Sequence, residues 1–147
     1  MDYTLKDNSR EILEAFERAK IRGLEAIGLE AEGNAKDILT EEVYSDDKEW
    51  PLTGRLRNSV TFALSGEKSN IDSYEYKEDG KKKKAYYKGR APKDKDTAVY
   101  IGTNVVYAPG IELGTHRAAG AVHFLQRSVE DFKDDYKEKM EDSMKNA

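Results

Sequence analysis

The side chains best suited to chemistry in this chain are two histidines and a glutamate around position 115. His116 and His123 stand seven positions apart, which is not the i, i+4 spacing that brings two metal ligands to one face of a helix. Glu112 precedes His116 by four positions, but Gly114 between them disfavours a shared helix. The chain contains no cysteine, so thiolate catalysis, disulfides and cysteine–zinc sites are excluded. We therefore expect no metal site.

Three glycines in the same region do not form a phosphate-binding loop. Gly102, Gly110 and Gly114 are not followed by Gly-Lys-Ser/Thr, and their spacing is not that of a dinucleotide-binding fingerprint. The chain also lacks the Gly-x-Ser-x-Gly elbow of α/β-hydrolases. The sequence therefore predicts a protein that is not an enzyme and binds no cofactor.

A run of four lysines indicates a different chemistry, the binding of nucleic acid. Tyr86 and Tyr87 follow the run closely, and proteins that bind single strands combine cations with aromatic rings in this way. However, acidic residues are interspersed, the net charge is -4 and the pI is about 5.4, whereas DNA-binding domains are usually basic. A solvated hairpin or a subunit contact is the favoured interpretation, with contact to DNA or a partner protein as the alternative. The run consists of Lys81, Lys82, Lys83 and Lys84.

Length and composition predict one domain with a modest core and a strongly ionised surface. The chain has 147 residues, of which 37% are hydrophobic and 37% are charged. No apolar run approaches the roughly 20 residues of a membrane helix, and the N-terminus lacks the features of a signal peptide. We expect a soluble protein that is not exported and has no membrane partner. Charge is uneven, since residues 51–127 carry 14 basic and 8 acidic side chains while residues 1–50 carry 7 and 14.

The spacing of apolar residues predicts a long helix over about residues 7–43. Asp7 or Ser9 would cap its start, and charged side chains fill its other face. Three glycines at 23, 28 and 33 interrupt the pattern, and we expect close packing or a bend there rather than a break into two helices. The apolar stripe comprises Leu13, Phe16, Leu24, Ile27, Ala31, Ala35 and Ile38.

Shorter elements follow Trp50-Pro51, where the helix must have ended. Thr53 could cap a single helical turn, and apolar residues at alternate positions of 60–64 predict a strand. Asp79-Gly80 is a type I′ turn sequence, which predicts a β-hairpin over 72–90. Residues 97–101 predict a further strand, and residues 121–144 an amphipathic C-terminal helix. The expected fold is α+β, with the two helices packed on a small, mostly antiparallel sheet over 60–107 and one extended hairpin.

The segment from Ile101 to Thr115 is too rich in apolar residues for a solvated loop and too rich in glycine and proline for a long helix. Pro109 suits the first position of a short helical turn, and Gly114 suits its C-terminal cap. Tyr107 and Ile111, four positions apart, would then hold that turn against the sheet. Glu112 would project from this rigid base toward a basic side chain of another copy.

Arg55 and Arg57 stand two positions apart beside the predicted strand at 60–64. In an extended segment they would face the same way, and in a helical turn they would diverge. Two interpretations remain: surface solubility, or bidentate pairing with carboxylates of a neighbouring subunit.

Two motifs together resemble one protein family. The segments Thr53-Gly-Arg-Leu-Arg-Asn-Ser-Val60 and Ile101-Gly-Thr-Asn-Val-Val-Tyr-Ala-Pro-Gly-Ile-Glu-Leu-Gly-Thr115 are similar to those of tail-completion and head–tail joining proteins of tailed phages, often described as minor tail protein Z-like or phage morphogenesis proteins. The order of elements is also similar. The chain departs from the family pattern at Gly110, where an aromatic residue is common, at His123, where proline is expected, and at Gln126.

The resemblance implies a structural protein of the phage neck, assembled in the bacterial cytoplasm and located in the virion. It implies a homo-oligomeric ring, six-fold in our expectation, that joins the head connector to the tail tube and has at most passive contact with packaged DNA. The alternatives are a head-side minor capsid or adaptor protein and, in a different class, a DNA-binding module. The residues expected to shape the motif are Thr53, Gly54, Gly102, Tyr107, Pro109 and Gly114, and the subunit-interface candidates are Arg55, Arg57, Glu112, Thr115 and Arg117.

Overall fold

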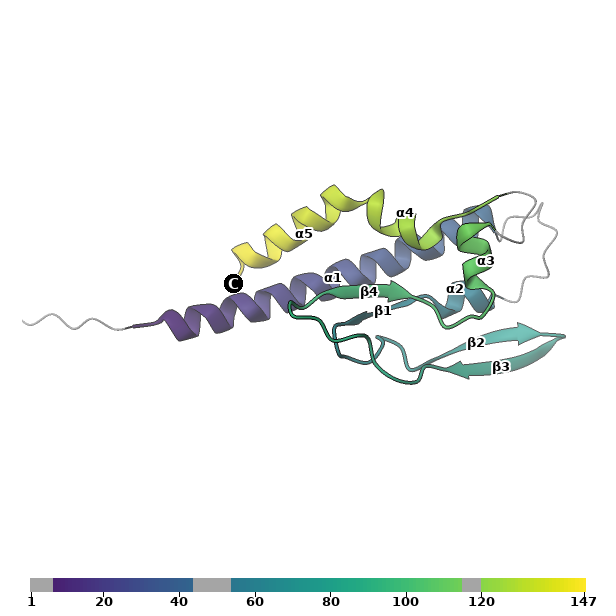
Figure 1. Cartoon of the computed structure of the whole chain (residues 1–147), viewed down its shortest axis with the longest axis horizontal. Coiled ribbons are helices and arrows are strands. Elements are labelled where there is room, and N and C mark those ends of the chain that lie inside the picture. Colours follow the sequence, from purple (N-terminus) through teal and green to yellow (C-terminus); the bar gives the residue numbers. More distant parts are fainter. Residues whose placement is uncertain (1–6, 44–53, 115–119) are drawn as a thin grey trace, which may run out of the picture.

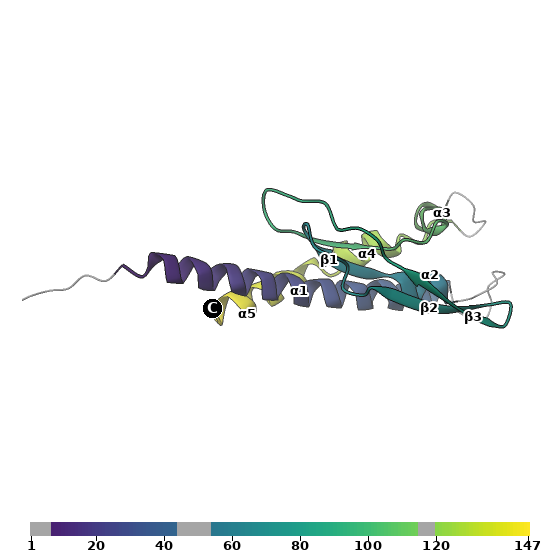
Figure 2. The same cartoon turned by 90° about the horizontal axis from the view of Figure 1, so that it is seen from below.

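Helix α1 (Ser9–Glu42) extends along the molecule, and most other elements pack against it (Figure 1). This computed structural model describes residues 7–43, 54–114 and 120–147. Helices α2 (Arg55–Ser59), α4 (Phe124–Glu130) and α5 (Lys133–Lys145) contact α1, and so do strands β1 (Thr61–Leu64) and β4 (Val99–Gly102). The helices α4 and α5 lie on one side of α1 and the strands on the other, so the fold is a mixed α+β arrangement around one helix (Figures 1 and 2).

The long helix begins one residue away from the caps that the sequence suggests. Asn8 occupies the N-cap position and makes no side-chain cap bond, so the prediction of Asp7 or Ser9 as N-cap is wrong. Asp7 still contributes, because its carboxylate accepts hydrogen bonds from the Ser9 amide, at 2.9 Å, and from the Ser9 hydroxyl. The first of these bonds satisfies the Ser9 amide, which has no hydrogen-bond partner inside the helix.

The glycines of α1 leave the helix unbroken. A Cβ at Gly28 would overlap the ring of Phe62 at Cδ2, and one at Gly23 would lie 2.8 Å from the sulfur of Met140. The predicted close packing is therefore confirmed at these two positions. At Gly33 a Cβ would meet no atom within 4 Å, so packing does not explain that glycine.

The strands form two separate two-stranded sheets within the described part of the chain. Strand β1 pairs antiparallel with β4, and β2 (Ser73–Glu78) pairs antiparallel with β3 (Lys81–Tyr86). Asp79 and Gly80 connect β2 to β3 with φ of 52° and 73°, as a type I′ turn requires, so the predicted hairpin is confirmed. The expected small antiparallel sheet with one extended hairpin is confirmed, and the hairpin forms a pair of its own, because β2 contacts α2 and does not extend the β1–β4 pair.

The predicted continuous helix over 121–144 is wrong, because α4 and α5 are separated at Asp131 and Phe132. Phe132 has φ of -121° and ψ of 17°, outside the helical region. The carbonyl of Ser128, which would accept from the Phe132 amide in a continuous helix, accepts the Tyr136 hydroxyl instead. That hydroxyl also accepts from the Asn34 side chain at 2.9 Å, which ties the break to α1.

The hydrophobic core lies beside the C-terminal half of α1. Ala35, Ile38 and Leu39 of α1 meet Leu56 of α2 and the fully buried Phe124 of α4. The first turns of α1 lie outside this core, and Leu13 and Phe16 of the predicted stripe are exposed. The other core residues are Val43, Val60, Tyr74, Val105, Ala108, Ile111 and Val122.

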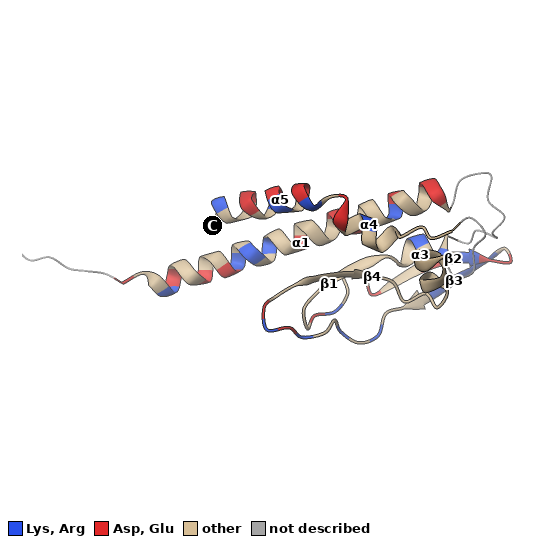
Figure 3. Ribbon diagram, turned by 45° about the horizontal axis from the view of Figure 1, so that its top comes forward, with Lys and Arg blue, Asp and Glu red and all other residues tan. Residues whose placement is uncertain are grey.

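Charge is distributed unevenly over the elements. Acidic and basic side chains alternate along α5, while basic side chains gather on the β2–β3 hairpin (Figure 3). No helix in the described ranges is long and apolar enough to cross a membrane.

We predict that Gly28→Ala is less stable than Gly33→Ala. Both substitutions gain about 1 kcal/mol of helix propensity, but only the first forces a methyl group into Phe62. Overpacking of this kind costs about 1–3 kcal/mol. Urea unfolding of the two variants measures the difference, and equal stabilities would contradict the close contact between α1 and β1.

Candidate assembly site around the junction of the two motifs

The two sequence motifs meet in space through a buried serine. The hydroxyl of Ser59, at the end of α2, donates to the carbonyl of Leu56 at 2.6 Å and lies 2.5 Å from the hydroxyl of Thr103, just after β4. The carbonyl of Ser59 accepts the hydroxyl of Tyr87. Ser59 is fully buried, and each of these bonds offsets the cost of burying a polar group.

The hairpin is attached to the same junction. The Tyr74 hydroxyl donates to Oδ1 of Asn104 at 2.6 Å, and Nδ2 of Asn104 donates to the Tyr86 carbonyl at 3.2 Å. The rings of Tyr74 and Tyr87 lie 5.9 Å apart, a spacing typical of attractive aromatic pairs. One polar network therefore joins Ser59 and Thr103, which are 44 positions apart in sequence. The same network includes the start of β2 and the end of β3.

Helix α2 directs its two arginines to different neighbours. Gly54 has φ of 74° at the N-cap position, and its carbonyl accepts the Asn58 amide at 2.9 Å. The guanidinium of Arg55 lies 4.8 Å from the centre of the Tyr76 ring, and Nη1 of Arg57 donates to the Thr40 hydroxyl at 3.3 Å. The arginines thus diverge, as a helical turn requires, and both make contacts within the chain.

Helix α3 (Ala108–Leu113) forms the predicted short turn in the second motif. Pro109 lies in the first turn, although α3 begins at Ala108, so proline takes the second position and not the first. Gly114 caps the helix with φ of 76°, as predicted. A Cβ there would also lie 2.5 Å from the backbone nitrogen of Ala121, so both its backbone angle and its surroundings require glycine.

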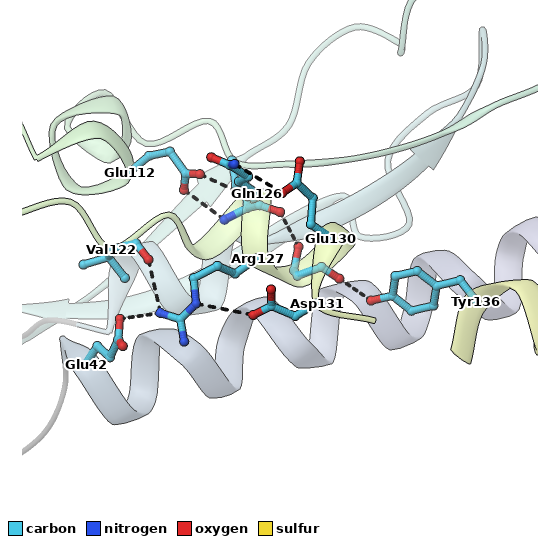
Figure 4. Close-up of polar contacts among 10 residues, drawn as sticks. Glu42, Glu112, Val122, Gln126, Arg127, Glu130, Asp131 and Tyr136 are labelled. Atoms are coloured by element: carbon cyan, nitrogen blue, oxygen red, sulfur yellow. Dashed lines mark hydrogen bonds and ion pairs between the residues drawn. The ribbon is translucent and has the colours of Figure 1, made fainter. Parts of the chain in front are cut away.

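Glu112 does not project from α3 toward another copy, contrary to the prediction. Its carboxylate oxygens accept hydrogen bonds from the backbone amides of Leu125, at 2.9 Å, and Gln126, at 3.0 Å (Figure 4). These amides belong to the first turn of α4, whose N-cap residue His123 provides no side-chain cap bond. A carboxylate at this place satisfies unpaired donors and interacts favourably with the helix dipole. Glu112 therefore acts as the cap of α4.

Backbone bonds and an arginine complete this joint. The amides of Val122 and His123 donate to the carbonyls of Ile111, at 3.0 Å, and Glu112, at 3.1 Å. Arg127 of α4 reaches Glu42 at the end of α1, with Nη1 and Oε2 2.8 Å apart (Figure 4). Arg127 was not predicted as a functional residue, because its only local signal in the sequence is the i, i+4 spacing to Asp131, the other acid that it contacts, at 3.6 Å.

Tyr107 is not buried against a sheet, contrary to the sequence analysis. Its side chain is 47% exposed, and the neighbouring Val106 and Leu113 are also exposed. The anchoring role falls to Ala108 and Ile111, which point into the core. Tyr107 is the N-cap residue of α3 and lies outside the helix that Ala108 and Ile111 hold against the core.

The lysines of β3 are exposed, and several already have partners in the hairpin. Lys82 pairs with Glu75 at 3.3 Å and Lys83 with Glu78 at 3.4 Å, while Nζ of Lys84 lies 5.5 Å from the centre of the Tyr86 ring. Nucleic acid would have to compete with these acids for the lysines. The geometry thus favours a self-contained hairpin over a strong polyanion site.

The remaining residues singled out from the sequence fall into two groups. Gly102 makes no side-chain contact that would explain a glycine there, and the others lie outside the described residues. Gly102 ends β4 opposite Thr61, and a Cβ there would meet nothing within 4 Å. Thr53, Thr115, Arg117 and His116 lie outside the described residues.

The contacts around the junction hold helices, strands and the hairpin in fixed positions. Within residues 7–43, 54–114 and 120–147, no group of three or more His, Cys, Asp or Glu side chains could hold a metal ion. Comparison with protein-family models, with curated proteins and with solved structures finds no match to this chain.

We predict that Glu112→Ala lowers the stability of the protein by about 0.5–2 kcal/mol, the usual cost of losing a helix cap. Glu130→Ala is the matched control, because that carboxylate accepts only from the side chain of Gln126, at 3.3 Å, among its described bonds. Thermal unfolding measures both. A Glu112→Ala protein as stable as the control would show that the two amide bonds contribute nothing.

A second prediction concerns alkaline pH. Burial raises the pKa of Tyr87 from 10.0 to about 12. Because the folded state disfavours the tyrosinate, the stability from this group is complete below pH 10 and is lost as pH rises toward 12. Tyr87→Phe should therefore show a shallower fall in unfolding free energy over this range. The remaining slope would come from other tyrosines, including Tyr136, whose pKa burial also raises. Identical slopes would contradict the buried, protonated state of Tyr87.

Proposed function

We propose that this chain is a non-enzymatic structural subunit of the neck of a tailed phage, forming a ring between the head connector and the tail tube. The observation that carries the proposal is the meeting of the two family-like motifs through Ser59 and Thr103. Both segments resemble the same family in sequence, and in this structure they pack against each other. We expect such packing if the chain shares the fold of that family. The order of elements, from a long helix through strands to C-terminal helices, agrees with the same resemblance.

The contacts of the polar motif residues support an architectural role. Glu112 caps α4, Arg55 stacks on Tyr76, and Arg57 contacts Thr40. Each of these contacts holds one element of the molecule against another, which is the role of residues that maintain a shape. Glu112, Arg55 and Arg57 remain candidates for a subunit interface, but only the solvent-exposed parts of their side chains could contact another subunit. Glu112→Lys would therefore remove the cap of α4 and not only an outward contact.

Exposed apolar side chains support assembly with other proteins. Val106 and Tyr107 directly precede α3 and Leu113 is its last residue, while Ile12, Leu13 and Phe16 lie in the first turns of α1. Exposed apolar residues that lie close together mark contacts with partner proteins more often than single exposed apolar residues do.

The proposal is tested with purified protein and with tail tubes and head connectors of the phage that encodes it. Negative-stain images should show rings with a central hole, either from the protein alone or at the ends of tails and connectors. Replacing Lys81–Lys84 by serines should change this little, and binding to DNA should be weak. A chain that stays monomeric and binds neither tails nor connectors would contradict the proposal. Salt-sensitive DNA binding that the serine variant abolishes would favour the DNA-binding alternative instead.

A further inference from the structure

The first turns of α1 carry an apolar ridge that no described element covers. Ile12, Leu13 and Phe16, which we call the α1 ridge, are 51%, 63% and 45% exposed. Ile12 and Phe16 lie on the same face of α1 as Ala19 and Gly23, given their helical spacing. That face is covered further along by α5, where the Ser143 hydroxyl donates to the Ala19 carbonyl at 2.6 Å. Helix α5 ends at Lys145, and the ridge continues the packing face beyond it (Figure 1).

A groove that could receive such a ridge lies elsewhere on the same chain. It runs between α1 and β1, has a volume of about 880 Å³, and we call it the α1–β1 groove. Ile21 and Leu29 line it from α1, and Phe62 and Leu64 line it from β1. Leu29 is 58% exposed, so the groove presents apolar surface to water that a partner would bury favourably.

The ridge cannot fill the groove of its own molecule. Both belong to one continuous helix, Ser9–Glu42. Phe16 and Leu29 are therefore fixed about 20 Å apart along the axis, at 1.5 Å of rise per residue. A helix cannot fold back over this distance without breaking its hydrogen bonds. An α1 ridge that occupies the groove must therefore belong to a different molecule.

The charges beside the two surfaces are mixed, and their small surpluses have opposite sign. In the turns of the ridge, Arg10 pairs with Glu14 at 3.2 Å, which leaves Glu11 and Glu17 against Arg18. On the rim of the groove, Glu67 pairs at 3.6 Å with Arg90, which lies outside the lining, and this leaves Arg22 and Lys68 against Glu25. The ridge thus has one negative charge in excess, and the rim, with Arg90 counted, has one positive charge in excess. Such complementarity favours the ridge of an identical chain as the partner and orients the encounter.

We propose that the α1 ridge of one copy docks in the α1–β1 groove of a second copy. The two surfaces differ, so the contact is heterologous and repeats from copy to copy, and a contact of this kind closes into a ring when its rotation allows. The inference rests on the proposed function, because it names the partner of a subunit that assembles with itself.

Cysteine cross-linking tests the contact directly, because the natural chain has no cysteine. Leu13→Cys and Leu29→Cys are prepared separately, mixed at high concentration and oxidised with diamide. A held contact raises the local concentration of the two thiols, so we expect the mixed 13–29 disulfide to exceed either homodimer by about tenfold or more. Leu113→Cys, an equally exposed leucine near α3, replaces either partner as the control and should give no such excess.

Blocking variants provide the second arm. A copy with Leu13→Asp and Phe16→Asp keeps its groove, and a copy with Leu29→Asp keeps its ridge; all three sites are exposed, so folding should be preserved. Each variant alone should stay monomeric in sedimentation, while their mixture should form a one-to-one complex that grows no further. Lys68→Glu should weaken the contact, because the groove rim would then repel the acidic ridge of the next copy. Adding Glu17→Lys to the same chain should restore the contact, because every copy then carries both exchanged charges.

The outcomes separate this inference from the proposed function. A statistical mixture of disulfides, or a dominant 13–13 product, would overturn the inference. So would cross-linking of Leu29→Cys in assembled necks to a different protein instead of a second copy. If rings persist in the blocking variants, the inference fails while the neck role stands. If the natural chain forms no rings and binds neither tails nor connectors, the proposed function fails.

Discussion

The continuity of α1 is the constraint on which the rest of the structure depends. One helix of 34 residues serves as the packing partner of α2, α4, α5, β1 and β4. It can do so because Gly23 and Gly28 remove side chains where Met140 and Phe62 approach its backbone. These glycines lower the intrinsic stability of the helix, and tertiary packing compensates for that loss. The same rigidity fixes the α1 ridge and the α1–β1 groove relative to each other.

The second feature of the architecture is that its polar residues serve as joints between elements. Ser59 joins α2 to the segment after β4, Asn104 joins that segment to the hairpin, and Glu112 joins α3 to α4. Each joint satisfies buried or terminal backbone groups, and this is the physical reason for placing polar side chains within apolar segments. A protein built in this way holds its surfaces in fixed orientation, which suits a subunit that must match identical neighbours.

The features predictable from sequence are those with local physical causes. The period of α1, the Asp79-Gly80 turn and the left-handed cap at Gly114 each follow from a few adjacent residues. The errors arise where the outcome depends on distant partners. Glu112 caps α4 only because Val122 and His123 return to pair with α3, and the break at Phe132 depends on the hydroxyl of Tyr136. Leu13 and Phe16 fit the helical stripe but are exposed because α5 ends before it reaches them.

The proposed role of this chain is that of a ring-forming architectural subunit at a head–tail junction. It can be tested by electron cryo-microscopy of intact particles that carry a tag on this subunit. We expect density for several copies in a closed ring around the DNA path between head connector and tail tube. Particles that lack the chain, or that carry it away from the neck without ring symmetry, would rule this role out.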